Sequence, residues 1–213
     1  MGTRNITMVV SGRATKLAQY GQWDGYPEGQ GLTVLAFSRD NLRTPDDRAA
    51  FAHQLELVRF ISPEQFKGLW EKVLGAPIIG DKWRPTDAQV DEFKRRHPYF
   101  TRDHGAEILS LVAKADGPVE TRDETDFLAD SLMCEWAYVI DLDQLTLEVF
   151  RGFNKKPLDE RERFHRLTEL SRKEWRGADQ YFPVRHLRSW RLDDLPSDEA
   201  FLRGLQELLS DND

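Results

Sequence analysis

Cysteine is nearly absent from this chain of 213 residues. The single thiol, Cys134, allows no disulfide within the chain and no cysteine cluster around a metal. One cysteine is typical of a protein in a reducing compartment, so we expect the cytoplasm. Long apolar runs are also lacking, since none approaches the roughly 20 residues that a membrane-spanning helix needs. We therefore expect no membrane partner.

Motifs for metals and cofactors are lacking as well. The histidines are scattered, and no two have the spacing of a zinc motif such as H-E-x-x-H. Asp141 and Asp143 flank the tip of a predicted hairpin, where acidic residues ordinarily form turns. We expect no metal and no cofactor.

Enough apolar sequence is present for a folded core, because 39% of the residues are hydrophobic and 11% are aromatic. No repeat, low-complexity tract or linker interrupts the chain. The length and composition predict one α+β domain over residues 1–213.

Charge is distributed unevenly. Residues 151–191 hold 12 lysines and arginines against 6 acidic residues, a net charge of +6, so the rest of a chain with total charge −7 carries −13. Such a segment can bind phosphate or an acidic partner, and Trp175 and Trp190 could stack on bases there. The other interpretation, which we favour, is a solvated face that pairs with the protein's own acidic residues. We expect no nucleic-acid binding, because the remaining charge repels polyanions.

Alternation of apolar residues predicts two hairpins. The first joins residues 5–11 to residues 15–23, and the second joins residues 136–141 to residues 145–153. A further strand is predicted within residues 181–190. These strands should form one layered sheet from hairpins that are distant in sequence.

Helix caps mark the region between the hairpins, roughly residues 44–114. Thr44, Ser62 and Thr86 each begin a capping pattern. The first helix should run to about Phe60, and residues 101–103 should cap a fourth helix. Further helices are predicted over residues 32–37 and 123–132, and a C-terminal helix should be capped by Ser197. The helix that begins at Ser62 should end at Gly75.

The segment YGQWDGYPEGQG, residues 20–31, is the strongest candidate for a binding site. It holds four of the 14 glycines, which allow close approach of a backbone or a ligand. It lacks the third glycine of a dinucleotide loop and the Lys-Ser/Thr of a phosphate loop. The candidate binding residues are the polar and aromatic ones: Tyr20, Gln22, Trp23, Asp24, Tyr26, Glu28 and Gln30. A structural alternative is that Trp23 and Tyr26 pack in the core while Asp24 forms its own turn.

Thr3 is a candidate catalytic residue. A small nucleophile that begins an N-terminal hairpin is the arrangement of N-terminal nucleophile hydrolases, in which the free α-amine is the general base. In this chain Gly2 precedes Thr3, so removal of Met1 alone would not expose that amine. If the protein is an enzyme, the pattern indicates an amide hydrolase.

Several segments together resemble an uncharacterised family of bacterial and phage proteins. They are the opening MGTRN, the segment QYGQWDGYPEGQG, and the later TRDHGAEILSLV and CEWAYVIDLDQLTLEVFRGF. The likeness extends to about Phe153 and implies that the glycine-rich segment matters. It implies no activity.

Two functional hypotheses follow. The first is a binding site for a small molecule or peptide on the glycine-rich aromatic loop, in a distant relative of the N-terminal nucleophile hydrolases. The alternative is a non-enzymatic module that contacts a protein partner through the same loop and the basic residues 151–191.

Overall fold

The fold was analysed in a computed structural model that describes residues 2–80, 83–174 and 180–210, without the side chains of 172–174. Its strands are β1 (Asn5–Ser11), β2 (Ala14–Gly21), β3 (Val58–Phe60), β4 (Val119–Thr121), β5 (Trp136–Asp141), β6 (Thr146–Arg151) and β7 (Arg185–Arg191). Its α-helices are α1 (Leu32–Asn41), α2 (Pro45–Leu55), α3 (Pro63–Leu74), α4 (Asp87–Arg96), α5 (Ile108–Ala113), α6 (Thr168–Glu174) and α7 (Asp198–Ser210).

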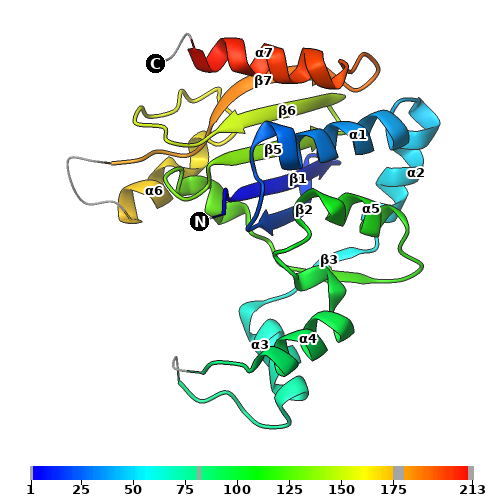
Figure 1. Cartoon of the computed structure of the whole chain (residues 1–213), viewed down its shortest axis with the longest axis vertical. Helices are drawn as coiled ribbons and strands as arrows, with labels where there is room; N and C mark the ends of the chain where they lie inside the picture. The colour runs from blue at the N-terminus through cyan, green and yellow to red at the C-terminus, as the bar shows by residue number, and fades with distance from the viewer. Residues whose placement is uncertain (1, 81–82, 175–179, 211–213) are drawn as a thin grey trace.

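The main sheet has five strands in the order β2-β1-β5-β6-β7 (Figure 1). β1 pairs parallel with β5, whereas the pairs β1–β2, β5–β6 and β6–β7 are antiparallel. The two predicted hairpins are therefore both present, and they join through their first strands. This confirms the α+β class and a sheet assembled from segments distant in sequence.

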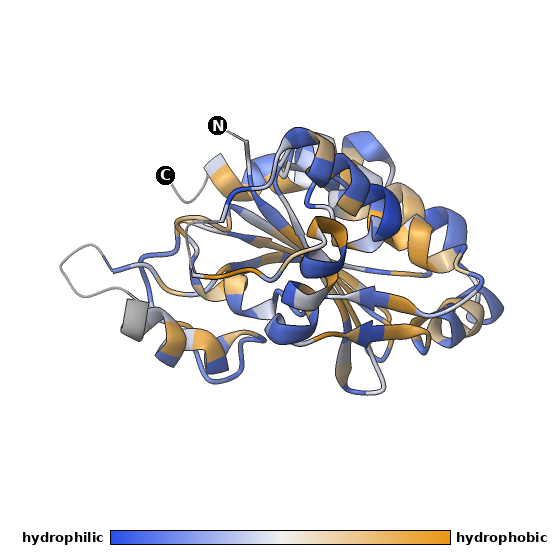
Figure 2. Ribbon diagram, turned by 90° about the horizontal axis from the view of Figure 1, so that it is seen from below, coloured by the Kyte–Doolittle hydropathy of each residue, from blue (hydrophilic) through white to orange (hydrophobic). Residues whose placement is uncertain are grey.

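Both faces of the main sheet are covered. Helices α1, α2, α5 and α7 pack on one face, where Tyr138, Ile140 and Leu147 are buried beneath them. The other face carries Ile6 and Phe150. It is covered by the chain segments that precede β5 and follow β6 in the sequence. Apolar and polar residues are interspersed along the strands and helices (Figure 2). Burial of apolar side chains between the sheet and the segments that cover its two faces is the main stabilising term of this arrangement.

The predicted caps are confirmed for three helices. Thr44, Ser62 and Thr86 each accept a hydrogen bond from the backbone three residues ahead, and each forms a complete capping box. Gly75 ends α3 with φ 68°, the left-handed conformation in which glycine carries little strain. The helix over residues 32–37 and the C-terminal helix are also present, as α1 and α7.

The predicted extent of α2 is wrong. The helix ends at Leu55, and Val58–Phe60 forms strand β3, which pairs parallel with β4. The Val119 N–H donates to the Leu57 carbonyl at 2.9 Å, so the chain leaves the helix to join a distant segment. The helical region between the hairpins therefore also contributes β3 to a small two-stranded sheet, whose other strand, β4, follows that region.

Two other predicted helices differ. Thr101 and Asp103 do not cap a helix, because the Thr101 hydroxyl bonds to Asp103 and Lys94 pairs with the same carboxylate. The helix that follows starts later, with a 3-10 turn at Gly105–Glu107 that leads into α5. The segment 123–132 contains only a short 3-10 helix, Thr125–Ala129.

Helices α3 and α4 extend away from the main sheet as a small lobe (Figure 1). Its interior is aromatic, with the Trp70 and Phe93 rings stacked at 3.8 Å and Phe66 edge-on to Phe93 at 5.7 Å. In the described part of the chain, no helix is both long and apolar enough to cross a bilayer.

Candidate functional site

The glycine loop, residues 20–31, connects the end of β2 to α1. Asp24 has φ 53°, which turns the chain sharply after Trp23. Pro27–Gly31 then forms one π-helical turn that leads directly into α1. The predicted second strand is shorter than expected, ending at Gly21.

Two hydrogen bonds hold the centre of the loop. The Gly25 N–H donates to the Thr3 carbonyl at 2.9 Å, and the Tyr138 hydroxyl donates to the Gly25 carbonyl at 2.8 Å. Burial keeps the pKa of Tyr138 well above its ordinary value, so its hydroxyl retains the donated proton. A Cβ on Gly25 would lie 2.7 Å from the Thr3 carbonyl oxygen and 2.9 Å from the Asn5 Cβ. This close approach requires glycine.

Most candidate side chains of the loop bind the loop itself or its support. Gln30 donates to the Trp23 carbonyl at 3.2 Å and accepts from the Ala106 N–H at 2.6 Å. The Trp23 indole N–H donates to Asp103 at 3.2 Å. Asp24 accepts from the Tyr26 hydroxyl at 3.1 Å. These contacts fix the loop geometry.

Trp23 and Tyr26 are 47% and 41% exposed. The alternative interpretation that they pack in the core is therefore wrong. Asp24 raises the pKa of Tyr26 by accepting a hydrogen bond from its hydroxyl, so the phenol stays neutral. Its oxygen can still accept a hydrogen bond.

Two clefts lie on either side of the loop. The α7 cleft, of about 420 Å³, is lined by Thr3, Tyr26, Pro27, Glu28, Glu135, Trp136, Arg151, Leu202, Leu205, Gln206 and Leu209. The β2-edge cleft, of about 390 Å³, is lined by Gln19, Tyr20, Tyr99, Phe100, Arg102, Thr121, Arg122, Glu124 and Phe127. Of the candidate residues, Thr3, Tyr26 and Glu28 thus meet in one cleft and Tyr20 lies in the other. Gln22 accepts from the Tyr20 hydroxyl at 2.6 Å.

The α7 cleft has one apolar and one polar side. Leu202, Leu205 and Leu209 recur at helical spacing on α7, a pattern visible in the sequence. The sequence does not reveal that part of this stripe faces the glycine loop. The polar residues of the lining include Glu28 and Glu135.

Arg151 lies on the polar side and is already engaged. Its guanidinium stacks on Trp136 at 4.4 Å and on Phe153 at 4.9 Å, and it donates to the Glu135 carbonyl at 3.1 Å. These contacts orient a cation at the rim of the cleft.

Thr3 lies just before β1 and lines the α7 cleft. Gly2 packs tightly before it, since a Cβ there would lie 2.3 Å from the Gln22 carbonyl oxygen and 2.4 Å from the Trp23 ring. The residues that line the cleft include no histidine or lysine to act as a separate base.

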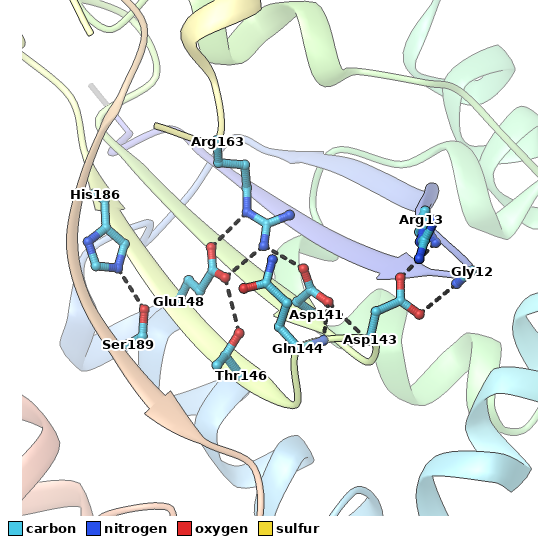
Figure 3. A network of polar contacts seen from close by, with 10 residues as sticks. All are labelled: Gly12, Arg13, Asp141, Asp143, Gln144, Thr146, Glu148, Arg163, His186 and Ser189. Atoms are coloured by element: carbon cyan, nitrogen blue, oxygen red, sulfur yellow. Dashed lines mark hydrogen bonds and ion pairs between the residues drawn. The ribbon is translucent and has the colours of Figure 1, made fainter. Parts of the chain in front are cut away.

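Within residues 151–191, several of the basic side chains that the structure describes contact the protein itself. Arg163 bridges Asp141 and Glu148, whose side chains are buried (Figure 3). Arg185 pairs with Glu162, and Arg191 pairs with Asp193. The Trp190 ring packs against Phe201 at 4.8 Å, whereas Trp175 lies outside the described residues. The interpretation as a face paired with the protein's own acidic residues fits these contacts.

The aspartates near the hairpin tip act in turns. Asp141 accepts from the backbone N–H groups of Asp143 and Gln144. Asp143 accepts from the N–H groups of Gly12 and Arg13, which ties the tips of the two hairpins together (Figure 3). Within the described residues, no three histidine, cysteine, aspartate or glutamate side chains gather as metal ligands.

A scan against protein-family models and searches of the curated proteins and of the solved structures find no match for this chain. The resemblance to a bacterial and phage family, and the distant relation to N-terminal nucleophile hydrolases, therefore stay predictions. The class that the fold and geometry define is an α+β protein with two clefts beside a glycine loop.

The first prediction concerns the close packing of Gly25 against Thr3 and Asn5. We expect Gly25→Val to lower the free energy of unfolding by about 1 kcal/mol or more, because the added carbons collide with the Thr3 carbonyl and Asn5. Gly117→Val is the matched control, since a Cβ there has no neighbour within 4 Å. Chemical denaturation measures both. Equal stability of the Gly25 variant and the wild type would contradict a constrained loop.

The second prediction concerns pH. The hydrogen bond from Lys94 lowers the pKa of Asp103, and the indole N–H of Trp23 acts in the same direction. A lowered folded-state pKa stabilises the protein above the ordinary value of about 3.9 and loses that effect as pH falls through the folded value. We therefore expect Asp103→Asn to cost about 0.5 to 1 kcal/mol at neutral pH, since the pair is partly exposed.

The difference between Asp103→Asn and the wild type should shrink as pH falls through the lowered folded-state pKa of Asp103, because the wild-type carboxyl then becomes uncharged like the amide of the variant. Thermal unfolding across pH measures this, with Asp116→Asn as an exposed control. A constant difference at all pH values would show that the charge of Asp103 is irrelevant.

Proposed function

We propose that the protein binds a short peptide, or a small molecule of similar chemistry, in the α7 cleft. The observation that carries the proposal is the meeting of Thr3, Tyr26 and Glu28 with the leucine stripe of α7. A volume of about 420 Å³ is within the usual range for small-ligand sites.

The lining chemistry favours an apolar group joined to an amine. Leu202 and Leu209, which are only partly buried, offer an apolar wall to an aliphatic side chain, and the buried Leu205 lies between them on α7. Glu28 and Glu135 offer carboxylates to an ammonium group. A peptide with a free amino terminus and an apolar first residue combines both features.

The third prediction tests this with leucyl-alaninamide and its N-acetylated form, measured by isothermal titration calorimetry. We expect the free-amine peptide to bind with a Kd of about 1 mM or below, and the acetylated peptide at least about fivefold more weakly. Glu28→Gln should weaken the free-amine peptide by a similar factor, because it removes one carboxylate. Glu207→Gln, an exposed α7 position outside the cleft lining, should change nothing. Equal affinity for both peptides would contradict the proposal.

A second candidate function is recognition of a protein partner by exposed aromatic residues. Tyr26 and Arg151 line the same cleft, and Phe153, 43% exposed, stacks on Arg151. Exposed aromatic side chains are enriched at binding surfaces. Phe153→Ser would weaken such a partner while sparing leucyl-alaninamide, because Phe153 does not line the cleft.

The fourth prediction concerns catalysis by Thr3. A nucleophile of this class needs its own α-amine free, so Met1 and Gly2 would both have to be removed. The tight packing of Gly2 against Trp23 favours its retention. We expect the intact mass of the chain, expressed as printed, to include Gly2. A product that begins at Thr3, and that Thr3→Ala abolishes, would instead favour an amide hydrolase.

A further inference from the structure

The β2-edge cleft lies where the helical lobe meets the main sheet. Tyr20 of β2 forms one side, and Tyr99 and Phe100 follow α4 on another. Arg122 and Glu124 follow β4. The cleft shares no lining residue with the α7 cleft, so its chemistry is independent of the function proposed above.

The outer edge of β2 is already occupied on both sides of this cleft. The Glu124 N–H donates to the Ala18 carbonyl at 3.3 Å, and the Gln22 N–H donates to the Arg102 carbonyl at 3.0 Å. The Gln19 side chain donates to the Tyr20 carbonyl at 3.0 Å. A partner strand therefore has little free edge to pair with, and the cleft suits a small ligand.

The cleft lining carries a positive charge in an acidic protein. Arg102 and Arg122 face only one carboxylate of the lining, that of Glu124. Burial raises the pKa of Glu124, with Arg122 acting in the opposite direction. Tyr20 also stays uncharged, because burial raises its pKa. Neither effect adds negative charge that would repel an anion.

Both arginines keep donors available. Arg102 makes one long side-chain contact, 3.5 Å from Nη1 to the Gln22 amide oxygen. Arg122 pairs with Glu124 through Nε at 3.2 Å and lies over the Phe66 ring at 4.9 Å. Among the described residues, the Nη groups of Arg122 have no hydrogen-bond partner. Guanidinium groups present paired N–H donors that match carboxylate and phosphate oxygens.

The remaining walls are aromatic. Tyr20 and Phe127 meet edge to face at 4.9 Å, and Tyr99 and Phe100 complete the lining. Aromatic walls favour a flat apolar group. We propose that the β2-edge cleft binds a small organic anion, in which a carboxylate or phosphate oxyanion meets Arg102 and Arg122 and a planar apolar group packs against the aromatic side chains.

The test uses benzoate and phenyl phosphate as probes on the full chain, titrated by two-dimensional NMR of the backbone amides. Benzyl alcohol supplies the ring without the charge, and acetate supplies the charge without the ring. We expect a Kd of about 1 to 10 mM for at least one aromatic anion, with both controls at least about tenfold weaker. The relative affinities of benzoate and phenyl phosphate identify the preferred oxyanion. Raising the salt from about 50 to about 500 mM should weaken the aromatic anions and leave benzyl alcohol unchanged.

Variants locate the binding. Arg102→Gln and Arg122→Gln should each weaken the better anion at least about fivefold. Arg95→Gln, an exposed arginine of α4 outside both clefts, and Glu28→Gln, in the α7 cleft, should leave it unchanged. Thermal unfolding of each variant checks that the fold is retained, and the exposed Arg102 provides the decisive variant if Arg122→Gln is unstable. Equal binding of benzyl alcohol and benzoate, no binding of either anion, or retention of full affinity by Arg102→Gln would overturn the proposal.

Discussion

The hydrogen bonds on the Gly25 backbone are the constraint on which the candidate sites depend. Through them the segment before β1 and the buried Tyr138 of β5 hold the same residue, one at its N–H and the other at its carbonyl. A buried backbone carbonyl needs a hydrogen-bond donor. Here the donor is Tyr138, which lies far from Gly25 in the sequence. The position tolerates no side chain, because Thr3 and Asn5 already fill the space. The loop therefore has one geometry, set by the sheet beneath it.

The loop lies between two clefts whose linings differ in chemistry. Its second half, with Tyr26 and Glu28, contributes to a cleft with an apolar wall from α7. Its beginning, at Tyr20, contributes to a cleft with arginines and aromatic rings. The hydrogen bonds of Trp23, Asp24 and Gln30 hold the loop in place between the two clefts. The polar and aromatic richness of the loop thus serves mainly to shape the two clefts, and only part of it faces them.

The arginines also fall into two groups, those that pair with buried carboxylates of the fold and those that line a cleft. Arg163 is shared by Asp141 and Glu148 where these side chains are removed from water, so loss of Arg163 would leave two buried carboxylates without this cation. This accounts for one of the 12 lysines and arginines of residues 151–191 without any external partner. Arg102 and Arg122, which line the β2-edge cleft, lie outside that segment. A count of charges along the sequence does not separate arginines that complete the fold from arginines that face a cleft.

The sequence by itself determined the local features. Thr44, Ser62 and Thr86 identified three helix starts because a capping box lies within four consecutive residues. Alternating apolar residues identified both hairpins because strand periodicity is equally local. Only the tertiary structure decided that Val58–Phe60 is a strand, since its partner β4 lies far along the chain. It alone brought Thr3 to the leucines of α7 and Tyr20 to Arg102 and Arg122, because such contacts depend on how the sheet orders its strands and on which helix covers which face.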